Sequence, residues 1–150
     1  MKSILRLAPV LRLTLIAGLM AAGAAHAEGE AADPTVKARM DLMKTVGANA
    51  KTLGEMASGK AVFDAAKAAE AKAALIAASA DIPAKFEPQA SDPASEALPA
   101  IWTSWDDFVA KAGALNTAAT ALDAASADSI KAGMAAVGGA CKACHTAYRM

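Results

Sequence analysis

The amino-acid sequence predicts an all-α protein that folds as an antiparallel four-helix bundle. Alanine, the strongest helix former, occurs 44 times among the 150 residues, whereas glycine and proline together occur 16 times. Apolar side chains recur at steps of three and four along several long segments, which is the period of an amphipathic helix. Aromatic residues make up only 4% of the chain, and this composition excludes a β-sandwich. A length of 150 residues suits a single domain.

Residues 1–27 are expected to be a cleaved secretory signal, which makes residues 28–150 the mature, periplasmic domain. The segment contains the basic residues Lys2, Arg6 and Arg12, followed by an alanine-rich apolar run over residues 13–25. It ends in Ala25-His26-Ala27, which has the small-residue pattern of a cleavage site. An uncleaved N-terminal anchor is the alternative. The mature chain carries 12 basic and 15 acidic side chains, a net charge of −3 that disfavours nucleic acid as a partner. No later stretch approaches the ~20 apolar residues of a membrane span, so no stable membrane insertion is expected after cleavage.

The first helix is expected over residues 33–57, with Asp33 as its N-cap and Pro34 as its first helical residue. One stripe of this helix holds an arginine and a methionine one turn apart, followed by apolar residues: Arg39, Met43, Val46, Ala50, Leu53 and Ala57. A second helix, nearly all alanine, is expected over residues 61–80. A long connection with three prolines follows over residues 82–98.

The third helix is expected over residues 101–122, opened by Pro99. Its apolar positions alternate by four and three, as in a bundle seam: Ile101, Trp105, Phe108, Ala112, Leu115, Ala119 and Leu122. The fourth helix repeats the pattern and turns both cysteines toward the core: Ile130, Met134, Val137, Cys141, Cys144 and Tyr148. Short connections on either side of one long connection indicate an antiparallel bundle.

The core of this bundle is short of apolar volume. Many seam positions are alanine, and 37 of the 123 residues from position 28 onward are alanine. Protein interiors are close-packed, so a bundle with such small side chains needs additional apolar material. A large apolar cofactor between the helices would supply it.

The segment Cys141-Lys142-Ala143-Cys144-His145 has the C-x-x-C-H spacing of covalent haem c attachment. On a helix these two cysteines and the histidine share one face, so both sulfurs can form thioethers while the imidazole reaches the iron.

Three other interpretations of this segment fit less well. A thioredoxin-like motif follows a strand. A zinc site needs a fourth ligand, and residues 28–150 contain no further cysteine or histidine. A disulfide or free-thiol pair leaves the adjacent histidine as a coincidence.

The segment CKACHTAYR, from Cys141 to Arg149, resembles the C-terminal motif of the class II c-type cytochromes, the cytochrome c prime family. The resemblance extends over residues 34–150. Three further segments are similar to the low-spin branch of that family: Leu42-Met43-Lys44-Thr45-Val46-Gly47, Ile82-Pro83 to Phe86, and Pro99-Ala100-Ile101-Trp102. The resemblance implies a four-helix bundle with one covalent haem c.

The resemblance also implies roles for residues of the first helix, which faces the distal side of the haem in this family. Met43 matches the position of the sixth iron ligand in low-spin relatives, with Met40 as its competitor. An ordinary core methionine beside an open distal site is the alternative. Arg39 matches an arginine whose guanidinium pairs with a haem propionate, although on its own it would be read as a surface residue.

On the proximal side, Arg149 lies four residues after His145 and matches a basic residue of cytochrome c prime. A cation favoured at a helix C-terminus is the simpler interpretation. Phe86 and Trp102 are expected to line the haem pocket or to be plain bundle core. The resemblance further suggests a homodimer.

Two functions compete at this point. The first is a periplasmic electron carrier with a Met/His axial pair, which raises the reduction potential, and with redox proteins as partners. The second is a five-coordinate haem protein that binds nitric oxide or carbon monoxide in scavenging or sensing, with Met43 as a steric gate. A structural or non-haem interaction module is a third possibility. The mature chain holds no Ser/His/Asp set and no phosphate loop, so no enzymatic activity is expected.

Overall fold

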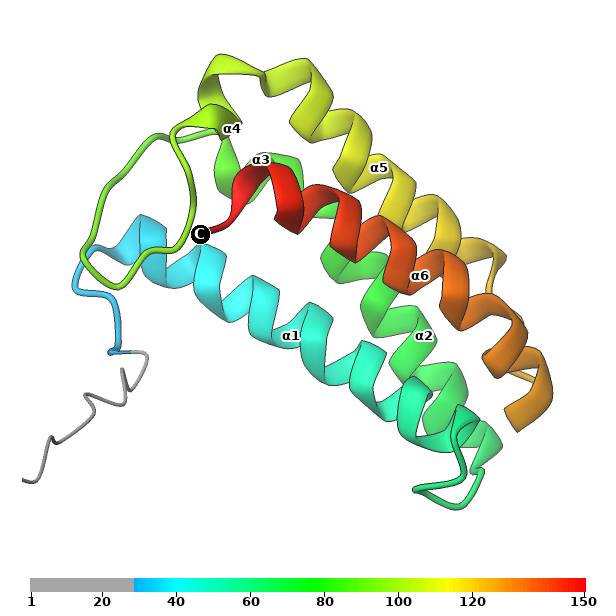
Figure 1. Cartoon of the computed structure of the whole chain (residues 1–150). Coiled ribbons are helices and arrows are strands. Elements are labelled where there is room, and N and C mark those ends of the chain that lie inside the picture. The colour runs from blue at the N-terminus through cyan, green and yellow to red at the C-terminus, as the bar shows by residue number, and fades with distance from the viewer. Residues whose placement is uncertain (1–28) are drawn as a thin grey trace, which may run out of the picture.

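The computed structural model describes residues 29–150, so the expected signal segment and the start at Glu28 lie outside the described residues. Four long helices form the body of the molecule, and two short ones lie between the second and the third (Figure 1). Their bounds are α1 (Pro34–Ala57), α2 (Ala65–Ala80), α3 (Ile82–Phe86), α4 (Ala100–Thr103), α5 (Trp105–Ala121) and α6 (Ala127–Tyr148). The predicted four-helix bundle is confirmed.

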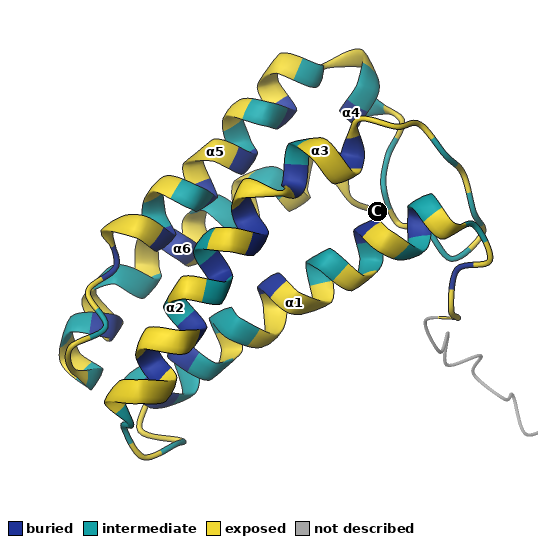
Figure 2. Cartoon of the chain, turned by 180° about the vertical axis from the view of Figure 1, so that it is seen from behind, coloured by how far each residue is buried: buried dark blue, intermediate teal, exposed yellow. Residues whose placement is uncertain are grey.

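The long helices run up and down in turn and close into a ring. α1 packs against α2 and α6, and α5 packs against the same two helices from the other side. Each helix turns its buried residues toward the centre of this ring, as Figure 2 shows. The most deeply buried large side chains come from α1, α2, α4 and α6 and from the residue that follows α5: Leu53, Leu75, Ile101, Leu122, Ile130, Val36 and Val137.

Local hydrogen bonds set the ends of α1 and the start of α6, and the sequence predicts the start of α1. The Asp33 carboxylate accepts from the amides of Thr35 (2.8 Å) and Val36 (3.0 Å), so α1 begins as expected. Gly59 then takes a positive φ of 75°, which a side chain would disfavour, and the chain turns away. Ser126 and Ser129 form a reciprocal capping box at the start of α6.

The second helix begins four residues later than predicted. Asp64 is extended, and its carboxylate accepts from the amide of Lys67 at 3.1 Å, so this N-cap starts α2 at Ala65 instead of position 61. The connection over residues 82–98 is also more ordered than expected. It opens with α3, whose two buried residues, Ile82 and Phe86, are one turn apart.

The third predicted helix is in fact two. Ser104 adopts φ −127° and ψ 45°, which lies outside helical geometry and separates α4 from α5. The apolar pattern continues across the break, because Ile101 and Phe108 are both buried in the same core cluster. Periodicity therefore predicted the buried residues but not the interruption.

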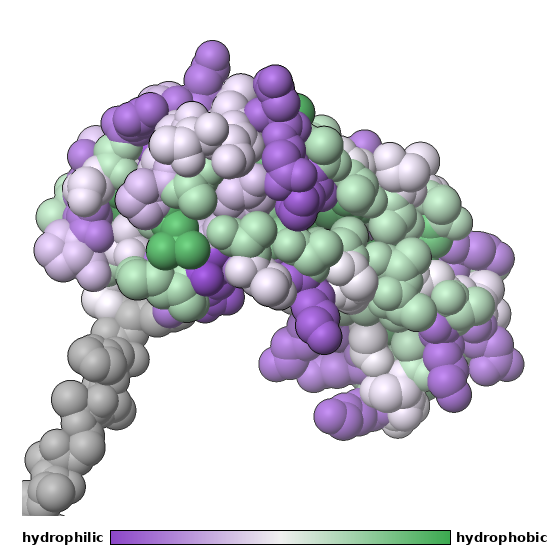
Figure 3. Space-filling model, turned by 45° about the horizontal axis from the view of Figure 1, so that its top comes forward, coloured by the Kyte–Doolittle hydropathy of each residue, from purple (hydrophilic) through white to green (hydrophobic). Residues whose placement is uncertain are grey.

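The outer surface mixes hydrophilic side chains with weakly hydrophobic areas, and the molecule is hollowed along one side (Figure 3). None of the described helices is long and apolar enough to cross a membrane.

Candidate cofactor site

A cavity of about 340 Å³ lies between α1, α5, α6 and the segment from α3 to α4. This volume is within the ~300–1,000 Å³ of ordinary ligand pockets. Its inner wall consists of buried apolar side chains, including Val36, Val46, Ile82, Ile101 and Leu115. The cavity lies at the end of the bundle that holds the predicted haem-attachment segment.

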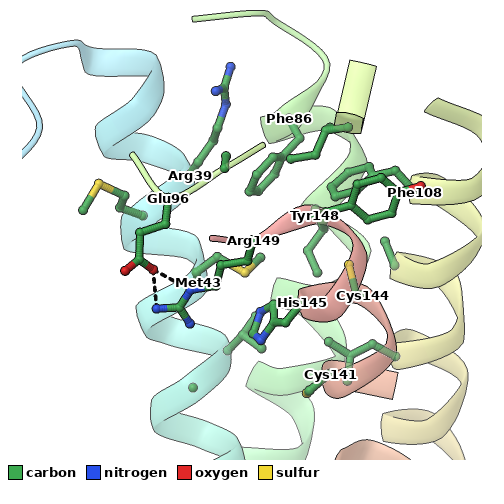
Figure 4. Close-up of a pocket in the computed structure, with 18 of the residues that line it drawn as sticks. Arg39, Met43, Phe86, Glu96, Phe108, Cys141, Cys144, His145, Tyr148 and Arg149 are labelled. Carbon is green, nitrogen blue, oxygen red and sulfur yellow. Dashed lines mark hydrogen bonds and ion pairs between the residues drawn. The ribbon is translucent and has the colours of Figure 1, made fainter. Parts of the chain in front are cut away.

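Cys141, Cys144 and His145 all line this cavity, and Figure 4 shows them side by side on α6. Both cysteines are half-buried free thiols. Burial raises the pKa of each thiol. Desolvation, followed by the nearby charge of Arg149, lowers the pKa of His145. A lower pKa favours the neutral imidazole, which is the form that binds metals.

Met40 and Met43 reach the same cavity from α1. Met43 is half-buried and packs against the hydrophobic core. Figure 4 shows its side chain extending from α1 toward α6, where His145 lies. The structure thus brings Met43 and His145 to one cavity from two different helices, while iron ligation by Met43 stays a prediction.

Arg149 also lines the cavity, and it is held there by a residue that the sequence did not single out. Its guanidinium forms an ion pair with the Glu96 carboxylate (Figure 4). Main-chain bonds support this pair, because the amide of Leu98 donates to the carbonyl of Tyr148 and the amide of Met150 donates to that of Glu96, both at 3.0 Å. Glu96 lies in the connection before α4, where no periodicity marks it.

Of the two aromatic residues predicted for the pocket, only Phe86 is among its lining residues. Its ring lies 5.2 Å from that of Phe108. Trp102 lies behind it, and its indole Nε1 donates to the Phe86 carbonyl at 2.8 Å. Arg39 also lines the cavity, yet its guanidinium donates to main-chain carbonyls of residues 85–90. Its contact with a haem propionate stays a prediction.

A polar group between α5 and α6 completes the site. The Tyr148 hydroxyl donates to Asp107 at 2.5 Å, and Lys111 Nζ donates to both oxygens of the same carboxylate at 2.6 and 2.7 Å. These hydrogen bonds, that of Lys111 first, lower the pKa of Asp107. The spacing of Asp107 and Lys111 would have suggested a helical ion pair, but nothing in the sequence connects them to Tyr148.

These residues fit haem c. The donor set is two free thiols and an imidazole on one helix face, beside a largely apolar cavity. Cys141 and Cys144 would hold the group through thioethers, and His145 would ligate its iron. When bound, it supplies a one-electron ferric/ferrous couple.

Comparison with known proteins identifies the family of this chain. Residues 34–149 match the family model described as cytochrome C′. The chain is 35% identical to a cytochrome c-556 from Agrobacterium fabrum over 91% of both chains. A solved cytochrome c′ from Rhodobacter sphaeroides superposes with a TM-score of 0.71 at 31% identity, over 77% of this chain and 95% of that one. A nitric oxide complex of a cytochrome c prime variant from Alcaligenes xylosoxidans matches at 30% identity and a TM-score of 0.67, over 77% and 93% of the two chains. The chain therefore belongs to the cytochrome c′ family of class II c-type cytochromes, whose cofactor is covalent haem c.

Proposed function

We propose that this chain is a periplasmic one-electron carrier in which His145 and Met43 are the two axial ligands of the haem iron. The observation that supports the proposal is the shared cavity, which Met43 enters from α1 and His145 from α6. An imidazole and a thioether together raise the reduction potential, because the soft sulfur favours ferrous iron.

The bundle suits electron transfer because both proposed ligands lie on long, well-packed helices. α1 is anchored beside Met43 by the buried residues Val36 and Val46, and α6 is anchored by Val137 and Tyr148. Ligands held in this way move little when the iron changes oxidation state. Redox proteins are the partners that the proposal requires, and it includes no enzymatic turnover.

Binding of a small gas molecule is the second candidate. It is favoured by the similarity to the cytochrome c prime of Alcaligenes xylosoxidans, a variant of which was solved as a nitric oxide complex. In this case Met43 is a wall of the distal pocket and leaves the iron five-coordinate. Nitric oxide or carbon monoxide then binds on the α1 side of the cavity.

Absorption spectra of the holoprotein and its Met43→Ala variant distinguish the two functions. If Met43 ligates the iron, the wild type has sharp low-spin bands. The variant becomes high-spin, has a lower reduction potential and binds carbon monoxide readily.

Met40→Ala is the matched control, because Met40 also lines the cavity from α1. It should leave the low-spin bands and the potential nearly unchanged. A wild-type protein that is already high-spin and binds carbon monoxide without delay would contradict the electron-carrier proposal.

A further inference from the structure

Arg39 is the one charged side chain that is fully buried among residues 29–150, with 2% of its surface exposed. A buried charge is costly unless other groups replace the water that it loses. No carboxylate forms an ion pair with this guanidinium in the described part of the chain. Desolvation lowers its pKa, although an arginine still remains protonated at neutral pH. The groups that replace its water therefore indicate what this residue does.

Three main-chain carbonyls accept hydrogen bonds from the Arg39 guanidinium. Its Nε donates to the carbonyl of Lys85 at 3.2 Å, its Nη1 to that of Ala90 at 3.3 Å, and its Nη2 to that of Pro88. These carbonyls belong to the end of α3 and to the irregular chain that follows it. The planar guanidinium of one arginine thus binds three carbonyl groups of the same connection.

Two aromatic rings cover the rest of the charge. The guanidinium carbon lies 5.5 Å from the centre of the Phe86 ring and 5.0 Å from that of Trp102, both within cation–π distance. The two aromatic residues are joined by the hydrogen bond from the Trp102 indole to the Phe86 carbonyl. Figure 4 shows the end of the Arg39 side chain directed away from Cys141, Cys144 and His145.

We propose that Arg39 is a positioning residue, which fastens residues 85–90 onto α1 and so fixes one wall of the haem cavity. Phe86 stands in this wall, and the same connection continues to the lining residues 94–97. The proposal holds whether or not Met43 binds the iron, because it concerns the wall and not the sixth ligand.

Hydrogen exchange of the holoprotein, read by mass spectrometry, tests the proposal together with the rate of carbon monoxide binding. Arg39→Met removes the charged hydrogen bonds. Exchange in peptides covering residues 84–92 should therefore rise about tenfold or more, the factor that corresponds to losing one such bond. Carbon monoxide should bind faster through the loosened wall. Exchange in α2 should stay unchanged. If exchange in α2 rose as much as exchange in residues 84–92, the variant would have lost stability throughout, and the proposal would be overturned.

Lys37→Met is the matched control for loss of a positive charge on the same helix. Lys37 lies two residues away and pairs at the surface with Asp41 and Glu30. This variant should leave both the exchange of residues 84–92 and the carbon monoxide rate unchanged.

Arg39→Lys separates the two roles and also decides the question if Arg39→Met does not fold. A lysine keeps the charge that a propionate would need, but its single ammonium cannot reach three carbonyls. We therefore expect Arg39→Lys to show raised exchange at residues 84–92. Unchanged exchange, accompanied in Arg39→Met by an altered pH dependence of the reduction potential, would show that Arg39 pairs with a propionate and would overturn the proposal.

Discussion

Tyr148 shows how a single residue links the cavity to the bundle. Its ring makes an edge contact with Phe108 at 5.4 Å, and its hydroxyl binds the Asp107 carboxylate on α5. The hydrogen bond to Asp107 is the main cause that raises the pKa of Tyr148 to about 12. The usual tyrosine pKa is about 10. The folded protein thus favours the neutral phenol.

The raised pKa predicts that Tyr148 stabilises the fold up to about pH 10 and that this contribution is lost as the pH rises toward 12. The chain has a single tyrosine, so its ¹³Cζ resonance can be followed without assignment in the diamagnetic carbon monoxide complex. The resonance should titrate near pH 12. In Asp107→Asn, where the acceptor charge is gone, it should titrate closer to 10. A wild-type midpoint near 10 would show that the hydroxyl does not bind Asp107 in solution.

At the level of elements, α6 approaches the end of α5 closely at one glycine. A Cβ on Gly133 would lie 3.1 Å from Leu122 Cγ and 3.3 Å from Leu122 Cα. Leu122 is buried, with 2% of its surface exposed, so it has little room to move. By contrast, a Cβ on Gly138 of the same helix would meet nothing within 4 Å.

These two glycines predict opposite effects of the same substitution. Gly138→Ala should stabilise the protein by roughly 0.5–1 kcal/mol, because alanine is the better helix residue. Gly133→Ala gains the same propensity but crowds Leu122, and overpacking costs about 1–3 kcal/mol. We therefore expect it to be about 1 kcal/mol less stable than the wild type in urea unfolding. Equal stabilisation by both substitutions would mean that α5 and α6 are farther apart than the structure places them.

The elements also show what sequence can and cannot predict. α1 was predictable because its N-cap and its regular apolar stripe agree, and α6 was predictable from its apolar stripe alone. The start of α2 was misplaced because the apolar residues 61–63 precede Asp64 and were counted with the helix, whereas the capping hydrogen bond of Asp64 marks the boundary. The break at Ser104 was missed because the apolar seam passes through it without a change in pattern.

The candidate site divides in the same way. Cys141, Cys144 and His145 are neighbours in sequence, so a helix alone brings them together. The partners of Arg149 and Arg39 lie about 50 residues away in an irregular connection, at Glu96 and at residues 85–90. Such contacts depend on tertiary packing, and no regular spacing of residues in the sequence predicts them.

On the scale of the whole molecule, the abundance of alanine explains why the bundle contains a cavity. Alanine gives helices of high propensity and little volume, so four of them can close into a ring without filling its centre. The cavity of about 340 Å³ lies where the C-x-x-C-H segment meets α1. We expect the covalent haem of this family to occupy the cavity and so to form part of the hydrophobic core.

This view predicts that the chain is poorly packed without haem. At about 24 cal/mol per Å³, an unfilled cavity of 340 Å³ costs at most about 8 kcal/mol. That is comparable to the ~5–15 kcal/mol by which native domains are stable. The double variant Cys141→Ser with Cys144→Ser should keep a helical far-UV signal, lose most of its near-UV signal and bind a hydrophobic dye. The wild-type chain made without haem attachment and kept reduced is the control for loss of the thiols, and it should behave in the same way. Cooperative unfolding of either haem-free protein at the midpoint of the holoprotein would show that the helices alone complete the core.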